Sequence, residues 1–251
     1  MKMKTRIFLA IMLTGLLTGY QSYAQVSAGV KGGLNLANLR GSSVQNNSML
    51  MGYNFGGFGE YQLEDLISGD IGEKLSGVVE LYVETKGAKA DYHFLSIPDD
   101  PTSTVITQPG AKQNFTYVTI PLLARYNWAP DSRSDFAFFG EFGPYAGALF
   151  GMTVDGEKWR DDDKNPATDE RKFREEYSGF DFGIIAGAGA TYKLPFGGRK
   201  QPFRAIFNVR YELGLSNIGE YKKLTIDIPE EDLKNIKTST IGISLGIAYD
   251  L

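Results

Sequence analysis

The sequence predicts an all-β fold, an eight-stranded antiparallel up-and-down transmembrane β-barrel, and three observations point to it. Eight segments alternate between large apolar residues and small or polar ones, the pattern of strands with two unlike faces. After the first 24 residues, no apolar run is long enough to span a membrane as a helix. The eighth segment, Ile241–Leu251, reaches the last residue, and pairing it with the first strand would remove an exposed edge.

The first residues predict an exported chain. A positively charged start is followed by a short apolar run, and Ser22 and Ala24 supply the small residues of a cleavage site after Ala24. We therefore expect residues 1–24 to be a signal peptide and residues 25–251 to form an outer-membrane β-barrel domain. An anchor helix is the alternative, but a spanning helix needs about 20 residues and this run is shorter.

The composition argues against several classes of function. Removing the signal peptide would take away Lys2, Lys4 and Arg6 and shift the formal net charge from −4 to −7. An acidic chain without a basic cluster argues against nucleic acid as a partner. The absence of cysteine excludes disulfides, thiol catalysis and thiolate metal sites, and no cofactor is expected.

The eight predicted strands each place apolar residues at alternate positions, with polar or charged residues between them. An even number of tilted antiparallel strands of about ten residues is the signature of an outer-membrane barrel. The first four, each with one residue of the apolar face and then one of the polar face in parentheses, are Val26–Asn38 (Val30, Lys31), Tyr53–Leu63 (Tyr61, Glu60), Gly77–Ala88 (Leu81, Glu80) and Phe115–Trp128 (Ile120, Arg125). The second four are Phe136–Met152 (Phe142, Glu141), Phe180–Leu194 (Phe182, Asp181), Arg204–Ser216 (Val209, Arg210) and Ile241–Leu251 (Ile243, Ser244).

The charged residues decide which face points into the barrel. An eight-stranded barrel has room inside for little more than a layer of side chains, so the bulky apolar face belongs outside, in lipid. The many glycines of the polar face fit a crowded lumen. The charges of the predicted strands all fall on the polar face. Leaving aside Asp250 near the chain end, they are Lys31, Glu60, Glu80, Glu84, Lys86, Arg125, Glu141, Asp181, Lys193, Arg204, Arg210 and Glu212.

This lumen charge network contains six cations and six anions. Buried charges must pair and accept or donate hydrogen bonds, because an isolated one is very costly. The equal count predicts a salt-bridged plug instead of a water-filled pore, for which an excess of one sign would be more typical. A proton or ion path through these residues is the alternative.

Connection lengths predict the orientation of the barrel. Long connections at about 39–52, 89–114, 153–179 and 217–240 belong outside the cell, and the short ones at 129–135 and 195–203 belong on the periplasmic side. The connection Glu64–Ser76 is longer than expected and partly extends the flanking strands in our interpretation. A periplasmic aromatic girdle supports the same orientation: Tyr61, Tyr126, Trp128, Phe136, Tyr192 and Tyr249.

Four groups of residues carry a family resemblance: Val30–Leu39 in the first predicted strand, Glu80–Tyr82 and Thr85–Lys89 in the third, Ile120–Leu123 with Tyr126 in the fourth, and Arg210–Tyr211 with Gly214–Ile218 in the seventh. They resemble the PorT-like outer-membrane β-barrel family. The resemblance implies a small barrel, mostly without assigned chemistry, with a branch linked to assembly of a protein secretion system. One departure from the family is the terminal Leu251, since barrel-insertion signals often end in an aromatic residue. In this chain, Tyr249 would be the aromatic residue that the barrel-insertion machinery recognises.

Two candidate sites lie in the predicted outer loops. His93, the single histidine, has Ser96 nearby, and a lipid-hydrolysing barrel would need such a pair with an orienting acid or amide. Asp161–Asp163 could offer oxygen ligands to Ca²⁺, but the surrounding order is not that of a calcium loop. We interpret both as solvated loop residues. Trp159 and Phe173 are candidate contact residues for an outside partner.

The sequence thus predicts a non-enzymatic integral outer-membrane protein of a Gram-negative envelope, with a porin-like fold and a surface-contact or envelope role. No catalytic, cofactor-binding or metal-ligating residue is assigned. The expected partners are outer-membrane lipid and lipopolysaccharide, the insertion machinery through the last strand, and an envelope protein. The alternatives are an accessory subunit of a secretion or envelope complex and, third, a lipid-modifying enzyme.

Overall fold

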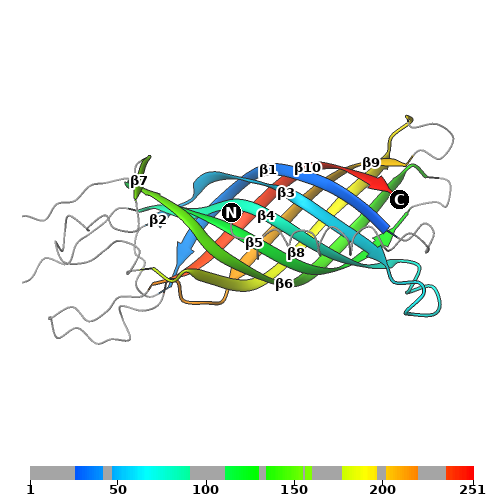
Figure 1. Cartoon of the computed structure of the whole chain (residues 1–251), viewed down its shortest axis with the longest axis horizontal. Coiled ribbons are helices and arrows are strands. Elements are labelled where there is room, and N and C mark those ends of the chain that lie inside the picture. The colour runs from blue at the N-terminus through cyan, green and yellow to red at the C-terminus, as the bar shows by residue number, and fades with distance from the viewer. Residues whose placement is uncertain are drawn as a thin grey trace, which may run out of the picture.

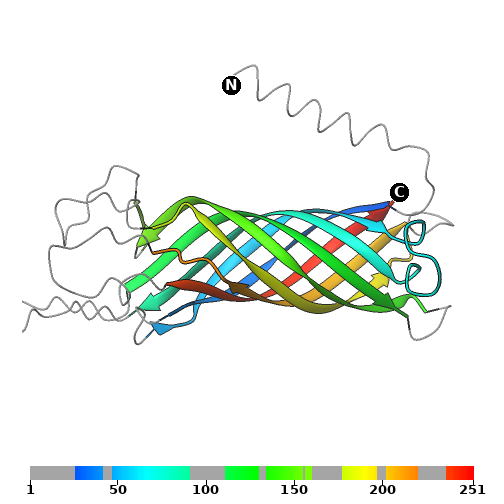
Figure 2. The same ribbon diagram turned by 90° about the horizontal axis from the view of Figure 1, so that it is seen from below.

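A computed structural model describes residues 26–41, 47–90, 111–129, 134–154, 156–159, 177–196, 202–219 and 236–251. These residues form a closed barrel of eight long antiparallel strands, seen from two sides in Figures 1 and 2. The long strands are β1 (Val26–Arg40), β3 (Leu50–Gln62), β4 (Leu75–Ala90), β5 (Ala111–Trp128), β6 (Phe136–Val154), β8 (Phe180–Lys193), β9 (Phe203–Gly214) and β10 (Lys237–Asp250). Two short strands, β2 (Asn47–Ser48) and β7 (Glu157–Trp159), pair with β4 and β6.

Each long strand pairs with its neighbours in the chain, and the sheet closes on itself. The first and last strands, β1 and β10, are paired from Ser27–Asp250 to Arg40–Lys237, and the pairing of β4 with β5 completes the ring. The predicted eight-stranded barrel is therefore confirmed. The predicted strands match the observed ones closely, although β5 begins four residues before the predicted Phe115 and β10 begins four residues before the predicted Ile241.

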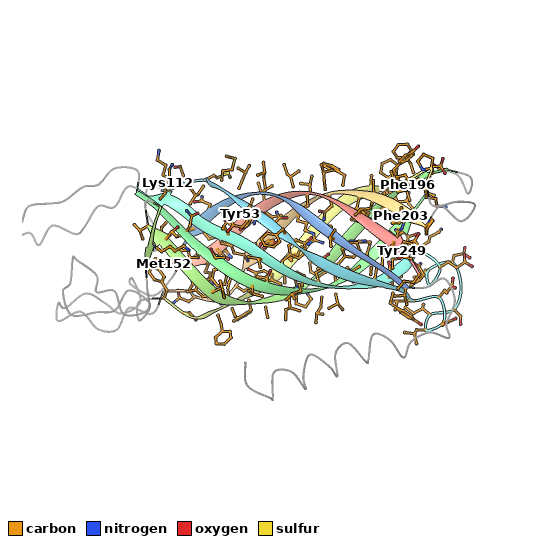
Figure 3. The ribbon with its side chains drawn as sticks, turned by 45° about the horizontal axis from the view of Figure 1, so that its top comes forward. Tyr53, Lys112, Met152, Phe196, Phe203 and Tyr249 are labelled. Atoms are coloured by element: carbon orange, nitrogen blue, oxygen red, sulfur yellow. The ribbon has the colours of Figure 1, made fainter. Side chains whose placement is uncertain are left out.

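The outer wall of the barrel is apolar. Side chains such as Leu245, Phe180 and Phe150 are 67%, 72% and 75% exposed, while the alternate positions are buried inside the barrel. Figure 3 shows apolar side chains projecting around the outside of the ribbon. A band of exposed apolar side chains around a closed barrel is what a hydrocarbon environment requires. None of the described segments is a helix long and apolar enough to cross a membrane.

Glycines on the inner face let the wall bend closely around the lumen. An ideal Cβ at Gly33 would overlap the carbonyl oxygen of Ile243, and one at Gly56 would overlap that of Leu81. The outward Gly59 has no atom within 4 Å of the same position. The close approach of neighbouring strands thus requires glycine at these inner positions, where a larger residue would collide with the backbone of the next strand.

Two apolar clusters lie inside the barrel at different depths. One, which we call the extracellular apolar cluster, lies where the long connections join the strands: Leu39, Ala88, Phe115, Tyr117, Leu149, Met152, Tyr177, Ile218 and Ile236. The other lies toward the end that carries the C-terminus: Phe58, Val78, Leu123, Phe139, Tyr145, Ile185, Ile206 and Ala248. Because short turns belong to the periplasmic side, we expect the C-terminal end to face the periplasm, and the terms periplasmic and extracellular are used below in this sense.

The connection between β3 and β4 is an ordered turn at that periplasmic end. The amide of Leu63 donates to the carbonyl of Leu75 at 2.9 Å, and the amide of Ile67 donates to the carbonyl of Leu63 at 2.9 Å. Strand β4 begins at Leu75, so only the last two residues of the predicted connection extend it. Leu66 and Ile71 are 73% and 62% exposed at this turn.

An ion-paired lumen as the candidate functional site

The inner face of the barrel carries two groups of charged side chains. The first, which we call the periplasmic ion-pair chain, is a continuous series of contacts made by four cations and four anions. The second, the extracellular ion-pair cluster, surrounds a single lysine. The chain consists of Lys31, Glu60, Glu80, Glu141, Arg125, Arg204, Arg210 and Asp250, and the cluster of Glu84, Lys86, Asp181 and Glu212.

Arg125 of β5 is the central link on one side of the lumen. Its Nη1 lies 3.0 Å from Oε2 of Glu60 on β3, and its Nη2 lies 2.8 Å from Oε2 of Glu141 on β6. The Arg125 side chain has no exposed surface, and its guanidinium carbon lies 4.3 Å from the centroid of the Phe139 ring. Planar guanidinium geometry suits such simultaneous pairing and stacking.

Arg210 of β9 continues the chain across the barrel. Its Nε lies 2.5 Å from Oε1 of Glu141, and its Nη1 lies 2.5 Å from Oε2 of Glu80 on β4. Lys31 of β1 completes this side, with its Nζ 2.7 Å from Oε1 of Glu80. Strands β4 and β9 are not neighbours in the sheet, so these pairs bridge the lumen.

Arg204 ends the chain near the periplasmic opening. Its Nε donates to Oδ1 of Asp250 at 2.8 Å, and its Nη2 lies 3.5 Å from Oε2 of Glu60. The hydroxyl of Ser27 also donates to Asp250 at 2.8 Å. Asp250, which the sequence analysis set aside as a chain-end residue, is thus a member of the lumen network.

Lys86 of β4 is the single cation of the extracellular ion-pair cluster. Its Nζ lies 3.3 Å from Oε1 of Glu84, 3.3 Å from Oδ2 of Asp181 and 3.1 Å from Oε2 of Glu212. The same ammonium lies 3.9 Å from the centroid of the Tyr145 ring. The Lys86 side chain has no exposed surface, so the surrounding side chains fill the lumen around it.

The three carboxylates of this cluster are stabilised unequally. Asp181 accepts hydrogen bonds from Tyr145 Oη at 3.0 Å, Thr238 Oγ1 at 2.9 Å and Ser216 Oγ at 2.7 Å. Glu212 Oε2, in contrast, has no hydrogen bond among the described residues and relies on its ion contact with Lys86. The cluster carries two more anions than cations, whereas the periplasmic chain is balanced.

The structure brings together every predicted lumen charge except Lys193. Lys193 lies at the end of β8, where its side chain is exposed, and it takes part in none of the ion pairs of the two groups. Lys193 is the last residue of β8 and lies opposite Arg204 of β9, a cation whose own ion pairs are with Asp250 and Glu60. The sequence analysis did not identify the extracellular apolar cluster, although inward alternation of Phe115 and Tyr117 is visible in the sequence.

The predicted periplasmic aromatic girdle forms a band of ring contacts on the outer wall. Tyr126 and Trp128 have ring centroids 6.4 Å apart, and Phe136 and Tyr192 have centroids 4.6 Å apart. Two predicted members remain: Tyr61 on β3 is half-buried at the same end, and Tyr249 on β10 contacts Phe203, with ring centroids 5.1 Å apart. Phe138, Phe196 and Phe203 join the band, and Figure 3 shows Phe196, Phe203 and Tyr249 together at this end.

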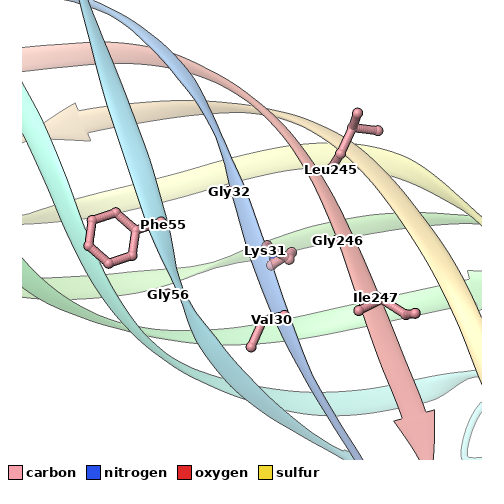
Figure 4. A pocket seen from close by; sticks show the side chains of 8 residues that line it. All are labelled: Val30, Lys31, Gly32, Phe55, Gly56, Leu245, Gly246 and Ile247. Atoms are coloured by element: carbon pink, nitrogen blue, oxygen red, sulfur yellow. The ribbon is translucent and has the colours of Figure 1, made fainter.

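The outer wall also has one open groove over β1, β3 and β10 (Figure 4). Gly32 lies directly between Phe55 and Leu245 in the strand registers, and Val30 and Ile247 also border the groove, whose volume is about 550 Å³. The groove faces the apolar exterior, so lipid chains cover it in a membrane.

The loop residues singled out in the sequence lie in parts of the chain that the structure does not describe. These are His93, Ser96, Asp161–Asp163 and Phe173, together with the signal peptide; of Trp159 only the backbone is described, in β7. Within the described ranges, no group of three or more histidine, acidic or cysteine side chains has a geometry that could hold a metal ion.

Several solved barrels are similar to this chain at low identity. OprG from Pseudomonas aeruginosa has 11% identity and a TM-score of 0.47, over 92% of this chain and 99% of OprG. Neisserial surface protein A has 11% identity and a TM-score of 0.46, over 89% of this chain and 97% of that protein. Ail of Yersinia pestis has 10% identity and a TM-score of 0.37, over 90% and 99%. No curated protein matches this chain.

A family model adds direct sequence evidence to the closed barrel, the apolar outer wall and the polar lumen. The model described as outer membrane protein beta-barrel domain matches residues 20–220. That range contains seven of the eight long strands and most of the chain. The protein therefore belongs to the outer membrane protein β-barrel domain family and is an outer-membrane protein.

Proposed function

We propose that this protein is a non-enzymatic outer-membrane barrel whose lumen is closed by paired charges and which acts through its extracellular side in a surface-contact or envelope role. The observation that carries the proposal is the periplasmic ion-pair chain, which bridges the lumen through Arg125 and Arg210. A water-filled pore would leave such charges hydrated, whereas the side chains of Arg125, Glu80 and Glu141 have no exposed surface.

The extracellular apolar cluster supports a closed lumen independently. Phe115 and Tyr117 are fully buried inside the barrel, and the rings of Phe115 and Tyr177 are in edge contact with centroids 4.9 Å apart. Ions crossing the barrel would therefore have to pass an apolar layer and then two levels of fixed charges. Apolar constrictions exclude ions by dewetting.

Conductance in planar bilayers tests this proposal. Folded wild-type protein should give no ion-conducting steps, because each level of the lumen is filled. A variant that thins the apolar layer and truncates the cations at both charged levels, Phe115→Ala with Lys86→Ala, Arg125→Ala and Arg210→Ala, should give steps if it folds. Steps from the wild-type barrel, at the same amount of inserted protein, would contradict the closed lumen.

The non-enzymatic assignment rests on how the described polar groups are used. The charged lumen side chains contact one another, and the single histidine, His93, is outside the described residues. We expect His93→Ala to leave the lipid A profile of the cell unchanged, as read by mass spectrometry. Loss of a lipid modification in that variant, with normal barrel levels, would identify an enzyme instead.

A second candidate is an accessory subunit of a secretion or envelope complex, which membership in the PorT-like branch would suggest. The observation that favours it is the ordered periplasmic turn, which exposes Leu66 and Ile71 beyond the girdle. A photo-crosslinking residue at Leu66 should capture one stoichiometric envelope protein in whole cells if this candidate is right. The same residue at the lipid-facing Phe150 is the matched control, and an equal pattern at both positions would exclude docking at the turn.

A further inference from the structure

The extracellular ion-pair cluster contains more negative charge than its single cation can balance. Lys86 is in contact with Glu84, Asp181 and Glu212, and the side chains of Lys86 and Asp181 have no exposed surface. The side chains of Glu84 and Glu212 are only 4% and 10% exposed. Buried carboxylates that share one site cannot all stay ionised without enough counterions, so one of them takes up a proton.

The other groups that face this cluster do not supply the missing positive charge. Arg210 lies two positions before Glu212 on β9, but all three nitrogens of its guanidinium donate to Glu80 and Glu141. The described inner residues of β1, β3 and β10 at this level are uncharged: Asn35, Asn54, Thr238 and Thr240. The remaining titratable side chains here are tyrosines, which carry no charge at neutral pH: Tyr82, Tyr117 and Tyr145.

Among the three carboxylates, Glu212 is the least stabilised as an anion. Asp181 accepts three hydrogen bonds from hydroxyl groups. Glu84 accepts one through Oε2, from Asn35 Nδ2 at 3.4 Å. Oε2 of Glu212 accepts none from the described residues and lies 3.1 Å from Lys86 Nζ. Because hydrogen bonds favour the ionised form of the carboxyl group that accepts them, the proton belongs on Glu212.

A protonated Glu212 would also find an acceptor for its proton. Its partner in the β9–β10 register is Thr240, which points inward and is 1% exposed. Oγ1 of Thr240 has no hydrogen-bond partner in the described part of the chain. Directly opposed residues have Cβ atoms about 4.5–5.5 Å apart, which is within reach of a hydrogen bond between their side chains. One proton on Glu212 Oε2, donated to Thr240 Oγ1, would give both atoms the partner that each lacks.

We propose that Glu212 is a proton-binding site inside the lumen and carries a proton at neutral pH in the folded barrel. The bound proton lowers the excess negative charge around Lys86 and joins β9 to β10 through Thr240. Release of the proton would leave two uncompensated negative charges directly below the extracellular apolar cluster and weaken the barrel there. This inference rests on the closed lumen, since water around Glu212 would stabilise its ionised form.

The direction of the pH dependence follows from counting protons in the two states. In the unfolded chain Glu212 is in water, where a glutamate loses its proton at about pH 4. Above that pH the folded barrel binds one proton more than the unfolded chain, so its stability falls as the pH rises, until Glu212 is ionised in the folded state as well. The equilibrium constant of unfolding should rise by up to about tenfold per pH unit in this range.

Nuclear magnetic resonance of the isotope-labelled full barrel in lipid vesicles tests the site directly. The carbon-13 chemical shift of a side-chain carboxyl group differs between its protonated and its ionised form, and Glu212→Gln assigns the Glu212 signal. At neutral pH we expect a protonated Glu212 beside ionised Glu84 and Asp181. In Glu84→Gln, which removes one neighbouring charge, Glu212 should lose its proton at a lower pH. An ionised Glu212 in the wild type, or a proton on Glu84 instead, would overturn the proposal.

Urea unfolding between about pH 6 and pH 9 supplies a second readout. Wild-type protein should lose stability as the pH rises, whereas Glu212→Gln should lack this component. Glu73→Gln, at an exposed glutamate of the periplasmic turn, is the matched control and should keep the wild-type dependence. A wild-type dependence retained in Glu212→Gln would contradict the assignment.

Two further comparisons separate the possible causes of failure. Replacing sodium by choline should change neither the Glu212 signal nor the stability. A stability that requires sodium would show that a metal cation balances the cluster and would overturn the bound proton. Ion-conducting steps from the wild type would contradict the closed lumen itself, whereas an ionised Glu212 in a non-conducting barrel would contradict the proton site alone.

Discussion

Arg125 shows how much a single buried residue contributes when two carboxylates depend on it. Replacing it by Met would leave Glu60 with only Arg204 and Glu141 with only Arg210 as ion partners. Both carboxylates are buried in the lumen. Breaking a buried pair costs about 3–5 kcal/mol, because the remaining charge is left unpaired. We expect Arg125→Met to lower the free energy of unfolding by about that amount in urea titrations of the barrel in vesicles. The exposed Lys193→Met is the control and should change little.

Glu212 and Glu141 are both lumen glutamates, yet the same substitution should affect them in opposite ways. Glu212→Gln removes one of two excess negative charges around Lys86 and should leave stability unchanged or raise it. Glu141→Gln removes the anion that two arginines share and should destabilise the barrel by about 3 kcal/mol. The midpoints of urea unfolding of the two variants are compared. An equal loss of stability in both would mean that the excess negative charge of the extracellular ion-pair cluster does not destabilise the barrel.

At the scale of elements, the contact between β1 and β10 depends on the absence of a side chain at Gly33. Gly33→Ala places a methyl group on the carbonyl of Ile243, so the strands must separate or the register must shift. Overpacking of this kind costs about 1–3 kcal/mol. The unboiled folded band should become weaker or melt at a lower temperature. Gly59→Ala, where the same atom meets open space, should behave as the wild type, and a Gly33→Ala barrel of normal stability would refute the close approach.

Strand positions could be predicted from the sequence because a lipid-facing wall enforces strict alternation over its whole height. The alternation weakens above the lipid, which is why the early start of β5 at Ala111 was missed. Side-chain partners could not be predicted, since Lys31 and Glu80 lie on strands that are not consecutive, and their contact depends on strand tilt. The same limit applies to Lys193 and Asp250. Each is the last residue of its strand, on the polar face of the alternation, yet only Asp250 contacts a cation of the lumen network.

The whole molecule offers a direct test of its orientation, because the chain has no cysteine and labelling has no background. A single cysteine replacing Met49, exposed near β2, should react with a membrane-impermeant maleimide on intact cells. A cysteine replacing Leu66 in the β3–β4 turn should react only after the outer membrane is permeabilised. The reverse pattern would mean that the short turns face outward and the long connections face the periplasm.

The pairing of β1 with β10 also has a consequence for the order in which the strands pair during folding. The hydrogen bond from Ser27 to Asp250 joins residues 223 positions apart, so one of the seams of the ring closes between the two most distant parts of the described chain. Contacts of such long sequence separation form slowly, because the entropy of closing the loop must be overcome first. Until then the barrel has two open edges whose amides and carbonyls lack partners in lipid. During folding, closure of the β1–β10 seam therefore competes with aggregation of the open sheet with other chains. A chaperone or insertion factor that binds β1 until β10 has formed would favour closure.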